Sequence, residues 1–403
     1  MKELTLELLA KAISQNDSAL RLRLKLEPVG GAGDKVFPPT YEGSSYAVEE
    51  RLAGGRPVKA VLLNSVQSEA ARLEQALKRA LERGDVCFPT IRLELDGHPS
   101  LTELDLPHRV FDGYLVNAKL GKDAFWESAT GKEIHSYRQP EATGLFRHSP
   151  VTLLFGGWDT HSLKDKTLAH KFRFPRAIVS EIVAYDITEM GKRPASKGDP
   201  LNLTGTVYES TAGGWTPSQE HAKREDGKPD GAPLKYGEKD TKGQLSSLGL
   251  GQITPHLQKQ DGNPNPGGYC AREISQTAVL SLSALRRLRF PLKPGAANDE
   301  KLNDAGRAVI AALGVYALSA ACAEGYWLRS RCELVAASPV ELETVKANGS
   351  VEKAPLPEPA QAAKLLDAAA KAAQKLGLNW RTEPLVAKPN AEFAELIRQQ
   401  GVV

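Results

Sequence analysis

The sequence has few cysteines, and their spacing forms no recognisable site. Its 403 residues include four cysteines, at 87, 270, 322 and 332, and the closest two are ten positions apart. Disulfide frameworks and zinc ribbons need closely spaced cysteine pairs, so neither is expected here. The pattern favours reduced, mostly buried thiols in a cytoplasmic protein.

The sequence also has no long apolar run and no strong net charge. The longest uncharged helical stretch, residues 308–323, is rich in alanine and shorter than the roughly 20 apolar residues of a membrane span. It therefore predicts a buried helix, and the amphipathic, charged N-terminus does not resemble a secretory signal. The formal net charge is +3, which neither requires nor excludes a nucleic-acid partner.

Catalytic motifs are missing from the sequence as well. It contains no P-loop, no His-Glu-x-x-His and no Gly-x-Ser-x-Gly motif. The Gly-x-Gly pairs at 31–33 and 249–251 lack the third glycine of a dinucleotide-binding fingerprint. The eight histidines are scattered. We therefore expect a protein that is not an enzyme, with no catalytic residues, no metal and no cofactor.

Hydrophobic patterning predicts an α+β fold. Residues 20–26, LRLRLKL, alternate with a period of two, which is typical of a half-buried strand, here with three positive charges on its outer face. Asn64 and Gln67 form a capping pair for the first long helix, and Gly84 ends it. Segregated strands and helices favour helices on one sheet face, and a ferredoxin-like core fits. Further strands are predicted at 91–95, 109–116, 151–155, 177–187, near 274 and from 326, and helices at 64–83, 301–325 and 360–376.

The composition changes sharply in the second half of the chain. Residues 189–272 contain 14 glycines and 8 prolines among 84 residues, which predicts a loop-rich insertion that projects from the core and holds a short hairpin. The core would then comprise residues 1–188 and 273–337. Residues 338–403, with a proline-rich linker and a helix, would form a C-terminal extension.

Three segments have the composition of a nucleic-acid contact. Cations neutralise phosphates and flat rings stack on unpaired bases, and residues 158–176 interleave both kinds of side chain. The predicted helix start at 64–72 offers short polar groups and free backbone N–H groups. The loop at 41–46 adds tyrosine and serine. The aromatic octapeptide of RNA-recognition modules is absent, which favours contacts to the RNA backbone and shape.

Five phrases in a fixed order carry a family resemblance. They are YEGSSYAVEE, LLNSVQSEAARLE, LLFGGWDTH, RFPRAIVSEIVAYDI and LSLSALRRLRF. Together, over roughly residues 20–335, they resemble the backbone subunit (Cas seven-type) of type I-G, formerly I-U, CRISPR Cascade surveillance complexes. That family belongs to the RAMP superfamily.

The resemblance implies both an architecture and a set of partners. It implies an RNA-recognition-like palm with finger loops, a thumb formed by the insertion, and copies arranged head to tail along a CRISPR guide RNA in antiviral defence. The guide would pair with target DNA beside the large and guide-processing subunits, away from any membrane. Guide-backbone contacts are expected from Asn64, Ser65, Gln67, Ser68, Arg72, Trp158, His161, Lys171, Arg173 and Arg176, with Tyr41, Ser44 and Ser45 as secondary candidates.

Two other functions stay open at this point. Related subunits of type III complexes cut target RNA with an aspartate in an early loop, and Asp34 lies in such a loop here. Metal-dependent cleavage needs further carboxylates, and none is close to it in sequence. The second alternative is a generic single-stranded RNA-binding protein outside CRISPR defence.

Overall fold

The structure is a computed structural model that describes residues 3–42, 46–135, 141–159, 173–190, 200–250, 267–293 and 295–400. The chain divides into two compact units. Unit 1 comprises Met1–Thr188 and Tyr269–Val403, and unit 2 comprises Glu189–Gly268. Unit 2 therefore spans nearly the same residues as the predicted insertion.

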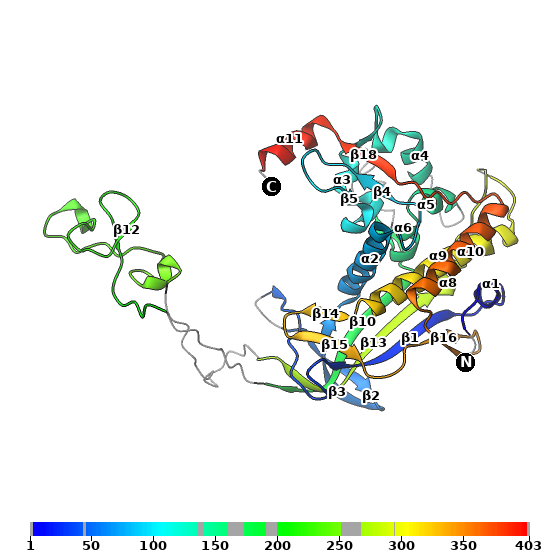
Figure 1. Ribbon diagram of the computed structural model, residues 1–403, viewed down its shortest axis with the longest axis horizontal. Coiled ribbons are helices and arrows are strands. Elements are labelled where there is room, and N and C mark those ends of the chain that lie inside the picture. Colours follow the sequence, from blue (N-terminus) through cyan, green and yellow to red (C-terminus); the bar gives the residue numbers. More distant parts are fainter. Residues whose placement is uncertain are drawn as a thin grey trace. The chain divides into compact units, whose positions relative to one another are not determined.

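A mixed arrangement of helices and one large sheet forms unit 1, and the predicted α+β class is confirmed (Figure 1). The sheet runs in the order β14-β15-β1-β13-β10-β3-β2. Helix α2 lies in sequence between β1 and β10, and α9 lies between β13 and β14. This connectivity is compatible with the predicted ferredoxin-like core. The strands are β1 (Ala19–Pro28), β2 (Val48–Ala53), β3 (Arg56–Asn64), β10 (Ile178–Glu189), β13 (Tyr269–Ser281), β14 (Tyr326–Arg329) and β15 (Cys332–Ala336).

The alternating pattern of β1 separates a buried face from an open one. Leu20, Leu22 and Leu24 are buried, whereas Arg23 and Lys25 are exposed, as the predicted period of two requires. The principal helices lie over the buried face (Figure 1). They are α1 (Leu6–Ser14), α2 (Val66–Arg83), α9 (Glu300–Ala323) and α10 (Pro359–Lys375).

Helix α9 is the central core helix of unit 1. Its apolar residues are buried on all sides, because α1, α2 and α10 pack around it. Among the described residues, it is the one helix long and apolar enough to cross a membrane, and 89% of its most apolar window is buried within the fold. The predicted buried helix is confirmed.

Two predicted strands are wrong. Residues 151–155 lie in helix α6 (Pro150–Phe155), where proline at the first helical turn favours a helix and every residue is buried. An apolar run buried on all sides has the same pattern in a strand and in a short core helix. Residues 109–116 form a 3-10 turn (Arg109–Phe111) and helix α3 (Gly113–Val116), which begins where Asp112 accepts a hydrogen bond from the Tyr114 N–H.

The ends of α2 confirm one capping prediction and correct the other. Ser65, rather than Asn64, is the N-cap, and its hydroxyl accepts a hydrogen bond from the Ser68 N–H at 3.2 Å. Gly84 ends the helix with φ of 75°, a conformation that disfavours any residue with a Cβ.

A second, five-stranded sheet in unit 1 has the order β5-β4-β18-β6-β7. Strand β18 comes from the predicted C-terminal extension and lies between two early strands, parallel to β4 and antiparallel to β6. The extension also supplies a hairpin whose first strand pairs with β1, and α10 packs against α9. The bounds are β4 (Ile91–Leu93), β5 (Leu101–Thr102), β6 (Ala118–Leu120), β7 (Asp123–Ala124), β16 (Glu341–Val345), β17 (Val351–Pro355) and β18 (Leu385–Pro389).

Short elements complete unit 1, and the part of unit 2 that the structure describes contains little regular structure. The short helices are α4 (Ala129–His135), α5 (Thr143–His148), α8 (Leu282–Leu285) and α11 (Ala391–Gln399). In the described part of unit 2, β11 (Tyr208–Glu209) pairs with β12 (Trp215–Thr216) as a short hairpin. Val207, Tyr208 and Ala222 are buried, whereas Trp215 is exposed.

The place of β18 in the second sheet generates a stability prediction. Ala387 is fully buried, whereas Val386 is more than one-third exposed, because alternate side chains of a strand point to opposite faces. Ala387→Asp would bury an unpaired carboxylate, and we expect it to lower the free energy of unfolding by about 3 kcal/mol. Val386→Asp is the matched control, and urea unfolding of both variants measures the difference. Equal effects would contradict the placement of β18.

Candidate nucleic-acid interface

Trp158 and Arg176, both predicted to contact RNA, line the same pocket. Trp158 belongs to β8 (Gly157–Trp158), which pairs with β9 (Arg173–Phe174). We call this site the Trp158 pocket; its lining is Pro107, His108, Arg109, Phe155, Gly156, Gly157, Trp158, Phe174 and Arg176. The structure thus brings together residues that the sequence placed 18 positions apart.

Glycine at position 156 permits the close packing of this pocket. Its φ is +81°, and a Cβ there would lie 2.6 Å from the carbonyl oxygen of Phe174. Any other residue would therefore push β9 away from the end of α6. Behind the pocket, the Phe111 ring stacks on Phe174 with centroids 5.1 Å apart. The wall that carries Arg176 is thus held by packed aromatic rings.

Two arginines give the pocket its positive potential. The buried Arg109 Nε donates to Glu74 Oε1 at 2.5 Å, and its Nη1 donates to the Gly156 carbonyl at 3.0 Å. Burial raises the pKa of Glu74 although Arg109 lies beside it. Half-buried Arg176 makes no hydrogen bond to any described residue. The Glu74 carboxylate therefore attracts both guanidinium groups, but it is hydrogen-bonded only to that of Arg109.

The surroundings of Arg176 favour an anion. Burial lowers the pKa of Arg176, and repulsion by Arg109 lowers it further. An arginine nevertheless stays charged, so the electrostatic cost persists until a negative group arrives. A phosphate would relieve it through charge-assisted hydrogen bonds.

Trp158 contributes a partly exposed ring to the lining of the pocket. Its side chain is 39% exposed, and the His108 ring meets it edge-on with centroids 6.3 Å apart. A flat, partly exposed ring beside a cation is the arrangement that binds an unpaired base together with its phosphate. The Trp158 pocket can therefore hold a nucleotide without reading the edge of its base.

Other residues that were predicted to contact RNA lie wholly or partly outside the described residues. His161 and Lys171 are two of them, together with Ser44 and Ser45. The backbone of Arg173 is described as the partner of Trp158, but its side chain is not. Tyr41 is exposed and does not line the Trp158 pocket.

Two residues predicted to contact RNA, Asn64 at the end of β3 and Arg72 of α2, have their polar groups engaged within the fold. Asn64 is buried, and its amide donates to Glu69 Oε1 at 2.7 Å. Arg72 donates to Glu69 at 2.9 Å and to the Ala321 carbonyl at 2.8 Å, and its guanidinium lies over the Tyr326 ring. Both side chains are therefore members of a buried polar cluster. Ser65, Gln67 and Ser68 are partly or fully exposed, but none lines the Trp158 pocket.

That cluster is centred on the Glu69 carboxylate, which is fully buried. Ser180 of β10 and Gln276 of β13 also donate to Glu69 Oε2, at 2.7 and 2.9 Å. Burial alone would raise the pKa of Glu69, but the charge and hydrogen bonds of Arg72, with those of Ser180 and Asn64, outweigh it. The pKa therefore lies below its ordinary value.

The open face of the large sheet is less basic than the sequence predicted. Arg21 Nε donates to Glu343 at 2.6 Å, and Lys353 pairs with Glu341 at 2.8 Å. Arg23 and Lys25 line a groove on this face that also contains Glu273 and Glu343. The predicted cations of β1 therefore lie among carboxylates.

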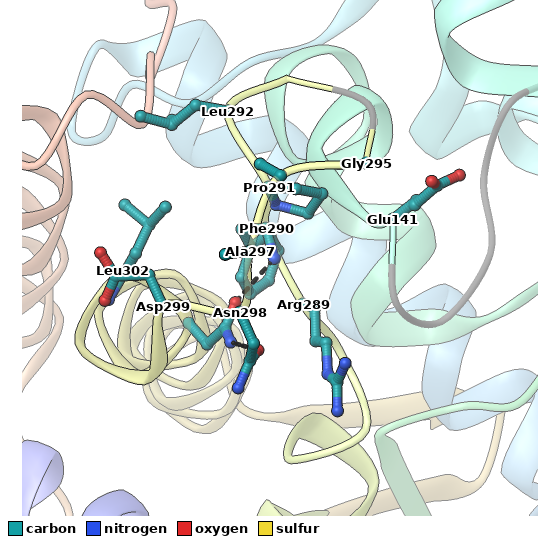
Figure 2. Close-up of a pocket in the computed structure, with 12 residues that line it drawn as sticks. Glu141, Arg289, Phe290, Pro291, Leu292, Gly295, Ala297, Asn298, Asp299 and Leu302 are labelled. Carbon is teal, nitrogen blue, oxygen red and sulfur yellow. Dashed lines mark hydrogen bonds between the residues drawn. The ribbon is translucent and has the colours of Figure 1, made fainter.

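A second pocket in unit 1 does not suit a phosphate. Figure 2 shows Glu141 and Arg289 beside the segment that leads into α9. Asn303 Oδ1 accepts the Phe290 N–H at 2.8 Å, and Asp299 caps α9. Its polar groups are thus largely engaged internally, and Glu141 and Asp299 oppose the single arginine.

The sequence did not predict His108 and Arg109, which line the Trp158 pocket, or Glu74, which pairs with Arg109. The sequence predicted a strand at residues 109–116, so the turn that contains Arg109 was not expected. Arg109 adopts φ of 53°, which is uncommon for a residue with a Cβ atom, and no sequence pattern predicts this conformation.

Among the described residues, no group of three or more histidine, cysteine, aspartate or glutamate side chains could hold a metal ion. Asp34, the alternative nuclease residue, is exposed, and its carboxylate accepts the N–H of Lys35 at 2.7 Å. This contact is typical of a turn aspartate.

Comparison with known families places the chain near CRISPR-associated proteins. Residues 20–189 match the sequence model of the family described as CRISPR-associated protein GSU0053. The matched segment includes β1, α2, the Trp158 pocket and β10. The predicted resemblance to a CRISPR-associated family is thereby confirmed. No curated protein matches the chain.

The buried Glu69 generates a prediction about acid stability. Because its pKa is lowered by folding, its contribution to stability is complete above the unfolded pKa of about 4.3 and is lost as the pH falls through the lower folded value. We expect Glu69→Gln to destabilise the fold by about 3 kcal/mol at neutral pH, because Arg72 loses its partner. The variant should also lose part of the fall in stability below pH 4.5.

Chemical denaturation at a series of pH values measures both effects. Glu82→Gln, at an exposed position of the same helix, is the control. An acid limb of the same slope in the Glu69 variant would show that this carboxylate does not carry the effect.

Proposed function

We propose that this protein is the guide-RNA backbone subunit of a type I-G CRISPR Cascade complex. Copies would polymerise head to tail along the CRISPR RNA and present it for pairing with target DNA in antiviral defence. The observation that carries the proposal is that the CRISPR-associated match includes every residue that lines the Trp158 pocket.

The chemistry of the Trp158 pocket supports a holder that is indifferent to sequence. Arg176 offers charge to a phosphate, and Trp158 offers a face to any base. A guide RNA differs in sequence from one complex to the next, so its holder must bind the backbone rather than base edges. In RNA-guided systems, base pairing reads the sequence while protein holds the strand.

The insertion between β10 and β13 supports the thumb assignment. In sequence, unit 2 lies between the end of β10 and the start of β13, and Trp215 is exposed on its two-residue strand β12. An aromatic wedge can unstack a nucleotide at a cost of a few kcal/mol, which further protein contacts must offset. In this proposal Trp215 is the leading candidate for that contact.

A modest charge also fits a polymer. The net charge of +3 would give a single copy weak, salt-sensitive affinity for RNA. Once one copy is bound, neighbours along the same strand bind at high effective concentration, so each site can be weak. Head-to-tail contacts of this kind extend into an open helical filament. The proposal includes the large and guide-processing subunits as partners, a cytoplasmic location and no catalytic step in this chain.

The Trp158 pocket generates a prediction about RNA affinity. Arg176→Ala should weaken binding of all RNA sequences alike and reduce the salt slope by about 0.7, the value for one phosphate of a single strand. Trp158→Ala should weaken binding about tenfold, corresponding to one stacked base, and leave the salt slope unchanged. Fluorescence anisotropy at several salt concentrations measures both quantities. Lys371→Ala, an exposed lysine on α10, is the control.

The filament generates a second prediction. With guide RNAs of increasing length, the mass of the complex should rise in steps of one protein copy, because each copy covers a fixed length of strand. Mass photometry of complexes assembled on the RNAs measures the steps. A fixed stoichiometry would indicate a generic RNA-binding protein instead.

Expression with the neighbouring genes, followed by sequencing of the RNA that co-purifies, tests the CRISPR assignment directly. Repeat-derived RNA is the expected result. Incubating that complex with complementary RNA and a divalent metal tests the remaining alternative. Regularly spaced cuts that disappear in Asp34→Ala would replace the proposal with a nuclease function.

A further inference from the structure

Trp327 is an exposed tryptophan on an edge strand of the large sheet. Its side chain is 69% exposed, although burying an indole ring is strongly favourable. Tyr326, the preceding residue of β14, is buried under the helices. Trp327 therefore lies on the opposite, open face of the sheet.

Neighbouring strands extend the apolar surface around Trp327. Glu333 of β15 is its cross-strand partner, and the Val29 N–H donates to the Glu333 carbonyl at 3.0 Å. Val29 is 54% exposed and Val335 is 42% exposed. Strands β14 and β15 and the turn after β1 thus expose apolar side chains around two carboxylates, Glu333 and Glu27, the second of which lies opposite Val335.

Two cations lie over the ring of Phe37, beside the turn of the hairpin that β14 and β15 form. The Phe37 N–H donates to the Arg331 carbonyl at 3.0 Å, which fixes the loop against the β14–β15 turn. Lys35 Nζ is 5.1 Å from the ring centroid, and the Arg331 guanidinium carbon is 5.4 Å from it. We call Val29, Lys35, Phe37, Trp327 and Arg331 the hairpin patch.

The backbone at Arg331 adds a second observation. Its φ is 59°, in the left-handed region, where glycine would fit at lower energy. The chain nevertheless has an exposed arginine at this turn, and its guanidinium lies over Phe37. Residues in strained conformations cluster at functional sites, and here the strain accompanies an accessible cation.

The two cations of the patch, Lys35 and Arg331, lie together at the turn between β14 and β15. The carboxylate of Asp34 accepts the backbone N–H of Lys35, so it caps its own turn. Glu333 lies opposite Trp327, two residues after Arg331, and Glu27 lies opposite Val335. No residue of the hairpin patch lines the Trp158 pocket.

We propose that the hairpin patch is a second contact for an unpaired nucleic-acid strand. One base stacks on Trp327, and the adjoining phosphate meets Lys35 and Arg331. This inference rests on the proposed function only in requiring that the protein bind a single strand. Unpaired RNA and unpaired DNA share this chemistry, and the experiment separates them.

The test measures binding of short labelled oligonucleotides of mixed sequence to the full chain, as RNA and as DNA. Trp327→Ala should weaken binding of at least one of them about tenfold. Arg331→Gly should weaken binding several-fold while the melting temperature stays equal or rises, because glycine relieves the backbone strain. Leu52→Ala, at a still more exposed apolar residue on the edge strand β2, is the matched control and should bind normally.

Ultraviolet cross-linking of the wild-type protein gives an independent readout. A cross-linked peptide that contains Trp327 is expected, and the preferred oligonucleotide identifies the strand as RNA or DNA. Unchanged binding by both variants, while Arg176→Ala loses affinity, would overturn the hairpin patch and leave the proposed function intact. Loss of self-association with normal oligonucleotide binding would also overturn it, in favour of a contact between copies. If the wild type binds no oligonucleotide, both proposals fail.

Discussion

The buried carboxylate of Glu69 is the interaction on which the architecture of unit 1 depends. It sits in the first turn of α2 and accepts hydrogen bonds from Arg72, from Ser180 on β10 and from Gln276 on β13. Gln276 in turn accepts from the Tyr326 hydroxyl at the start of β14. One charged group therefore fixes a helix against three strands. Because a buried carboxylate is tolerated only when it is fully partnered, each of these elements must be in register.

This constraint has a consequence for the candidate interface. The same helix carries Glu74 five residues after Glu69, where it pairs with Arg109 behind the Trp158 pocket. Strand β10, anchored through Ser180, begins directly after Arg176 and Ala177. The pocket is thus attached to the best-secured part of the fold, which limits the movement of Arg176 relative to Trp158.

The sequence predicts the helices and strands of unit 1 where apolar residues recur with the period of a helix or a strand. The alternating leucines of β1 and the apolar stripe of α2 were sufficient, because burial on one face leaves a periodic trace. Residues 151–155 were misassigned, because a segment that is buried on all sides shows no periodic pattern. For the candidate interface, composition and the family resemblance predicted Trp158 and Arg176, which line one pocket in the structure; their contact with RNA stays a prediction. Arg109 was not predicted, because its role depends on a turn and on a partner 35 residues away.

The pairing of β18 links parts of unit 1 that lie far apart in the sequence. Leu385 lies beside Ile91, 294 residues earlier in the chain. Loop closure over such a separation is slow, because the chain must lose much conformational entropy before the contact forms. On the ribosome, β4 and β6 are synthesised long before β18. The backbone groups that pair with β18 therefore stay without these hydrogen bonds until β18 has been synthesised. The nascent chain is therefore exposed to misfolding at these edges, and protection by a chaperone matters most during that interval.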